Sequence, residues 1–70
     1  MRIVTQRNES SIEFDGTEIF LQYEHVCYQS NVSKGKLGTY ESRERARDIF
    51  DEMHRQWEKD CMSVFYMPEE

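Results

Sequence analysis

Two histidines and two cysteines are the residues in this sequence with the widest range of chemistry. His25 and Cys27 lie two residues apart in a predicted strand, and His54 and Cys61 lie seven apart along a predicted helix. A helix packed on that strand could gather the two-histidine, two-cysteine ligand set of a structural zinc site. Neither spacing is the short Cys-x-x-Cys typical of zinc sites, however, and free cysteine is common in apolar cores. The pattern therefore favours two free thiols and neither a metal nor a cofactor.

Enzymatic activity is not indicated by the remaining reactive groups. A cysteine–histidine nucleophile would need a third orienting group, and no Gly-rich turn or oxyanion-hole pattern accompanies these residues. Glu13, Asp15, Glu18 and Glu24 could supply paired carboxylates for acid–base work, but carboxylates that alternate along strands and turns are typical of a solvated face. A chain of this length rarely encloses a substrate pocket. We expect a non-enzymatic protein without catalytic residues.

Basic residues cluster between a loop and the start of the predicted helix, at Lys34, Lys36, Arg43, Arg45 and Arg47. Such a cluster could contact phosphates, together with the free N–H groups at a helix start. Acidic residues are interleaved with it, and the net charge of −5 repels nucleic acid overall. Nucleic-acid binding through these five residues is therefore the alternative function, less favoured than protein binding.

Aromatic and methionine residues exceed what one small core needs, which favours protein–protein recognition. In the predicted sheet Phe20, Val26 and Tyr28 fall on the face that the helix does not cover. With Phe65 and Tyr66 they form the predicted partner-binding surface. We expect a second copy of the chain to shield this surface in a homodimer, with a host or phage protein as the other partner considered.

Strands are predicted from alternating and β-branched residues at 1–6, 11–14, 18–29, 36–40 and 63–67, with turns at 7–10 and 15–16 and a loop at 30–35. The segment 18–29 is read as one long central strand whose core face carries Ile19, Leu21 and Tyr23. The period changes to 3.6 from Ser42, the predicted N-cap, to about Asp60. The apolar stripe of this helix comprises Ala46, Ile49, Phe50, Met53, Trp57 and Cys61.

These elements predict an α+β fold, namely an antiparallel sheet of four to five strands with one long helix packed on one face. Seventy residues make a single domain, residues 1–70. A core of this size supplies only about 3 to 5 kcal/mol, so oligomerisation is the expected source of extra stability. No apolar run is long enough for a signal peptide or a membrane span, so we expect a soluble cytoplasmic protein.

The segment from Leu37 through Gly38-Thr39-Tyr40-Glu41-Ser42 to Ala46 leads into Ile49 and Met53. With the start Met1-Arg2-Ile3-Val4-Thr5-Gln6 and the closing Met67-Pro68-Glu69, it resembles short uncharacterised proteins encoded by phages, prophages and mobile elements of Gram-positive bacteria. The resemblance covers both ends and the helix, about half of the chain, and the segment 18–36 departs from it. It implies a phage or mobile-element origin and no site residues.

Overall fold

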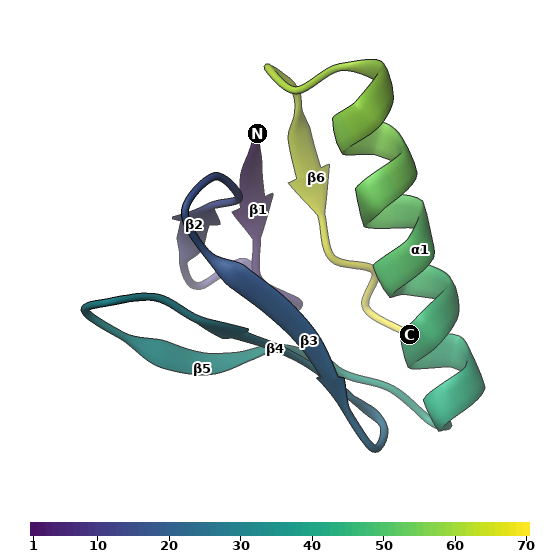
Figure 1. Ribbon diagram of the computed structural model, residues 1–70. Coiled ribbons are helices and arrows are strands. Elements are labelled where there is room, and N and C mark those ends of the chain that lie inside the picture. The colour runs from purple at the N-terminus through teal and green to yellow at the C-terminus, as the bar shows by residue number, and fades with distance from the viewer.

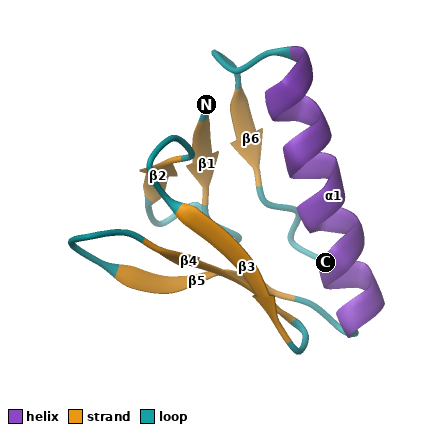
Figure 2. Cartoon of the chain, viewed as in Figure 1, coloured by secondary structure: helices purple, strands orange, loops and turns teal.

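The chain folds into two three-stranded sheets and one helix in a computed structural model that describes all residues from Met1 to Glu70 (Figures 1 and 2). The elements are β1 (Arg2–Val4), β2 (Ser11–Glu13), β3 (Glu18–Gln22), β4 (His25–Gln29), β5 (Lys34–Thr39), α1 (Arg43–Lys59) and β6 (Val64–Tyr66). The strand orders are β2-β1-β6 and β3-β4-β5. The predicted α+β class and the single helix are confirmed. The single sheet of four to five strands is wrong, because six strands divide equally between two sheets.

The predicted long strand at 18–29 is also wrong, because the chain reverses at Tyr23 and Glu24. β3 and β4 form an antiparallel hairpin in which Gln22 pairs with His25. Tyr23 has a φ of 55°, a conformation that hairpin turns need and that glycine or asparagine usually supplies. No Asn-Gly or Asp-Gly marks this turn in the sequence, so the alternation of residues continues through it without a break.

The reversal changes which side chains share a face. Residues directly opposite each other in an antiparallel pair lie on the same face, and Leu21 is opposite Val26 while Ile19 is opposite Tyr28. Val26 is fully buried and Tyr28 is packed against the core. Their predicted position on the uncovered face is therefore wrong.

The other sheet brings the two ends of the chain together. β1 is antiparallel to β2 and parallel to β6, so the predicted final strand does lie at a sheet edge, beside β1. In this register Ile3 is opposite both Ile12 and Phe65, and these three side chains form the inner face. Ile3 is fully buried, and Phe65 is nearly so.

The helix α1 begins one residue after the predicted N-cap. The hydroxyl of Ser42 accepts a hydrogen bond from the N–H of Arg45 at 3.1 Å, which satisfies one of the free donors of the first turn. Ala46, Ile49 and Met53 are fully buried, as the 3.6-residue period predicts.

The helix packs against β3 and β4. The predicted packing partners Ile19 and Leu21 are partly buried against the same core. Tyr23, however, is 69% exposed at the hairpin turn.

One core joins the helix to both sheets. Its ten buried members are Met1, Ile3, Val26, Leu37, Tyr40, Ala46, Ile49, Met53, Phe65 and Met67. The segment after β6 is held across this core, since the Tyr40 hydroxyl donates to the Pro68 carbonyl at 2.7 Å. The Arg45 guanidinium also donates to the main-chain oxygen of Glu70, at 2.7 and 3.1 Å. No helix has the length and apolarity needed to cross a membrane.

Candidate functional site

The outer face of β6 carries the most apolar side chains that the fold leaves in solvent. Tyr66 is 65% exposed and Val64 is 44% exposed, whereas Phe65 between them is buried. Met62, in the turn before the strand, is 87% exposed. We refer to Met62, Val64 and Tyr66 as the β6 face. Alternation along the strand explains the exposure of Val64 and Tyr66, because Phe65 and Met67 fill the core and the alternate positions must point outward.

The neighbouring strands place a paired set of charges beside this face. Arg2 is opposite Val64 on β1, and Val4 is opposite Tyr66. The Arg2 guanidinium lies 3.7 Å from the Glu13 carboxylate and also donates to the Ser11 hydroxyl at 3.0 Å. The Glu13 carboxylate is also 4.0 Å from the N-terminal ammonium of Met1, so the negative charge beside this face is paired, although the whole chain carries −5. The apolar side chains of the β6 face therefore lie beside paired charges and are available for contact.

The free edge of β6 is less available than its face. The Gln56 side chain on α1 donates to the Val64 carbonyl at 3.1 Å and to the Ser63 hydroxyl at 2.9 Å. A partner strand would have to displace the first of these bonds. Contact with side chains on the β6 face requires no such rearrangement.

The five predicted partner-binding residues do not form one surface. Val26 and Phe65 are buried core residues, and Tyr28 packs against that core. Phe20 lies on the other face of the β3-β4-β5 sheet, the face it shares with its cross-strand neighbour Cys27. Only Tyr66 presents most of its side chain to solvent. Val64 and Met62 were missed, although apolar residues at every position from Val64 to Met67 signal a strand with two apolar faces.

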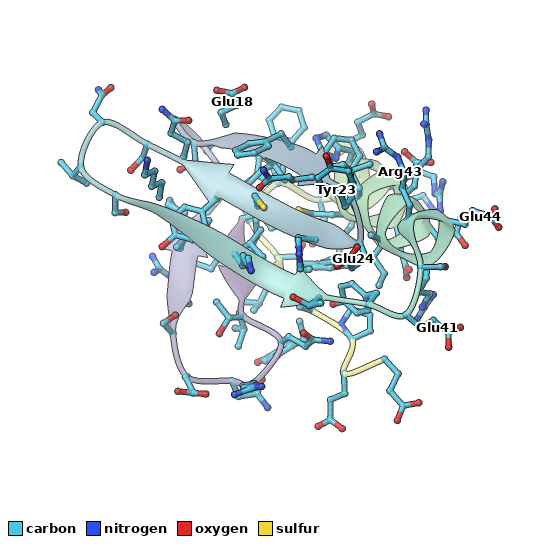
Figure 3. All side chains as sticks on the ribbon, turned by 90° about the horizontal axis from the view of Figure 1, so that it is seen from below. Glu18, Tyr23, Glu24, Glu41, Arg43 and Glu44 are labelled. Carbon is cyan, nitrogen blue, oxygen red and sulfur yellow. The ribbon has the colours of Figure 1, made fainter.

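The basic cluster is also dispersed. Lys34 pairs with Gln29 at the end of β5 far from the helix, and the five residue steps to Thr39 span about 17 Å. The guanidinium of Arg45 is occupied by Glu70. Arg43 lies at the same end of the molecule as Glu24, Glu41 and Glu44 (Figure 3). No continuous basic surface results from these five residues.

The histidines and cysteines lie in separate environments. His25 Nδ1 is 2.9 Å from the Thr39 hydroxyl, and its Nε2 is 3.3 Å from the Glu24 carboxylate. Cys27 is buried, and this burial raises the pKa of its thiol, while Cys61 is exposed. No three His, Cys, Asp or Glu side chains are grouped so that they could hold a metal ion. The two-histidine, two-cysteine set considered from the sequence is not brought together.

His54 belongs to an aromatic cluster between the helix and the segment after β2. Its ring lies edge-on to Phe14 with centroids 5.3 Å apart and 4.2 Å from the Phe50 ring, while Phe14 stacks on Trp57 at 5.4 Å. His54 Nδ1 is 2.8 Å from the Phe50 carbonyl, so this nitrogen carries the proton and donates. The geometry explains His54 as a packing residue.

Comparisons of the chain with protein-family models, with curated proteins and with solved structures found no match.

Proposed function

We propose that this protein is a small, non-enzymatic protein-interaction module and that the β6 face is its contact surface. The observation that carries the proposal is the exposure of Met62, Val64 and Tyr66 on and beside a three-residue strand whose other face is core. Adjacent exposed apolar side chains of this kind mark interaction sites more often than isolated ones do.

Tyr66 is the residue with the most to contribute. A buried tyrosine removes 150–250 Å² from water, so a side chain that is 65% exposed still offers roughly 100–160 Å². At about 25 cal/mol per Å² this area is worth about 3 kcal/mol before the costs of association. That value is on the scale of an interface hot spot, where tyrosine is enriched.

The biological setting in this proposal is intracellular and of phage or mobile-element type, and it rests on the sequence alone. Nucleic-acid binding through Lys34, Lys36, Arg43, Arg45 and Arg47 has less support than protein binding, since these side chains do not gather.

Two tyrosines of similar exposure make a matched experiment possible. A photoreactive phenylalanine analogue is placed at position 66 in one variant and at position 23 in another, since Tyr66 is 65% and Tyr23 69% exposed. Both are irradiated in a lysate of the organism that encodes the chain. We expect a discrete adduct with a protein other than this chain from position 66 only, which excess wild-type chain competes away and a Val64→Lys chain does not. Equal labelling of other proteins from both positions, or none from position 66, would refute the proposal.

A further inference from the structure

The outer edge of β3 is a second feature that the fold leaves without a partner. β3 has five residues and only β4 beside it (Figure 1). In the turn before β4 the Glu24 carbonyl accepts from the Tyr40 N–H at 3.0 Å, so by alternation residues 26 and 28 of β4 direct their backbone groups toward β5. Residues 25, 27 and 29 then direct theirs toward β3. On β3, residues 22, 20 and 18 are opposite residues 25, 27 and 29 and bond to them. The N–H and C=O groups of Ile19 and Leu21 therefore point outward.

Every other edge strand of the molecule is capped. On β2, the Arg2 side chain donates to the Ser11 carbonyl and the Thr17 hydroxyl to the Glu13 carbonyl. On β5, the Gln6 N–H donates to the Leu37 carbonyl, and the Gln6 side chain bonds to the N–H and the carbonyl of Thr39. On β6, the Gln56 side chain donates to the Val64 carbonyl. No such bond reaches β3, which also has no proline, lysine or bulge. Proteins normally protect edges by these devices, because a bare edge is a template for another strand.

We propose that β3 pairs antiparallel with β3 of a second copy of this chain, about a two-fold axis at Phe20, to form a six-stranded sheet. Ile19 then lies opposite Leu21 of the partner subunit, and four backbone hydrogen bonds use all the outward groups of both residues. Shifting this register in either direction leaves some of the outward N–H and C=O groups of Ile19 and Leu21 without partners. This strand pairing involves none of the residues of the β6 face, so it can be tested separately from the proposed function.

The side chains of β3 suit this self-pairing. Glu18 is opposite the neutral Gln22 of the partner subunit, so no like charges face each other across the axis. Phe20 is opposite Phe20 of the partner subunit on the face away from the helix, where aromatic cross-strand pairs are stabilising. Ile19 and Leu21, which are only partly buried, extend the core across the axis. Complementarity in hydrogen bonding, charge and apolar contact thus identifies a second copy as the occupant.

Amide hydrogen exchange tests the pairing on the unmodified chain. We expect the amides of Ile19 and Leu21 to become protected as chain concentration rises, in step with dimer formation measured by sedimentation velocity. The amide of Tyr66, on another edge, should not change. A chain that stays monomeric at millimolar concentration, or dimerises without protecting these two amides, would overturn the proposal.

Charge variants at the axis test the register. Phe20→Lys and Phe20→Glu place like charges opposite each other, and each alone should raise the dissociation constant about tenfold or more. An equimolar mixture should restore dimerisation by forming the mixed pair. Gln29→Lys and Gln29→Glu, on the central strand and the same sheet face, are matched controls and should dimerise normally. Mixed Phe20 variants that remain monomeric would contradict the two-fold at Phe20.

Discussion

The Gln6 side chain links the segment after β1 to Thr39 at the end of β5 and to Glu69 near the C-terminus. Replacing its amide nitrogen by oxygen should therefore lower the unfolding free energy. Its amide oxygen accepts from the N–H of Thr39 at 2.8 Å, and its amide nitrogen donates to the carbonyls of Thr39 at 2.8 Å and Glu69 at 2.7 Å. Gln6→Glu keeps the size and the acceptor. It removes both donors and directs a carboxylate at two carbonyl oxygens.

The expected loss follows from the two bonds that the amide nitrogen of Gln6 donates. Two hydrogen bonds at about 0.5–1.5 kcal/mol each give about 1–3 kcal/mol of lost unfolding free energy. Gln6 is partly exposed, so solvent screens much of the added charge repulsion. A domain of this size has about 3–5 kcal/mol in total, and each kcal/mol shifts the melting temperature by about 4–8 °C. Gln6→Glu should therefore melt clearly below the wild type.

Thermal unfolding followed by circular dichroism measures this loss. Gln29→Glu is the control, because it makes the same chemical change on an exposed strand residue with no side-chain hydrogen bond to lose. The two carbonyls should raise the pKa of the new carboxyl in the folded state, so the deficit should shrink as pH falls through that folded pKa. If Gln6→Glu and Gln29→Glu melt at the same temperature, the bridging role assigned to Gln6 is incorrect.

Three further outcomes can be measured. Ser42→Ala should lower the unfolding free energy by about 1 kcal/mol in chemical denaturation, because the N-cap bond is lost, and no change would contradict the cap. Burial raises the pKa of Tyr40 to about 12, so the unfolding free energy should fall as pH rises from 10 to 12. Tyr40→Phe has neither the ionisable hydroxyl nor its bond to Pro68, so its unfolding free energy should depend less on pH over this range. A thiol reagent should modify Cys61 rapidly and buried Cys27 slowly, and two equal rates would argue against this placement.

Local patterns were sufficient to predict the helix and several strands. The spacing of Ala46, Ile49 and Met53 predicted the buried side of α1, and Ser42 predicted its start, because both signals depend on a few neighbouring residues. The β3–β4 turn could not be predicted in this way. Tyr23 and Glu24 are not typical turn residues, and the energy that holds Tyr23 at a positive φ comes from pairing strands on both sides of it.

That one turn also explains why Val26 and Tyr28 were wrongly predicted as partner-binding residues. Without it, Val26 and Tyr28 keep the parity of Phe20 and fall on the open face. With it, cross-strand pairing puts them on the core side, and Phe20 remains on the other side with Cys27. The parallel pairing of β1 with β6 was equally hidden, since residues more than 60 positions apart meet only after the helix has returned the chain.

The sequence by itself determined the α+β class, the extent and capping of the helix, and the presence of a final strand, because periodicity and capping act over a few residues. Only the tertiary structure decided that there are two sheets, which side of each strand faces the core, and which strand edges are capped. Those features depend on long-range pairing. They leave β6 with an exposed apolar face and β3 with an open edge, the two surfaces on which the proposals for this protein rest.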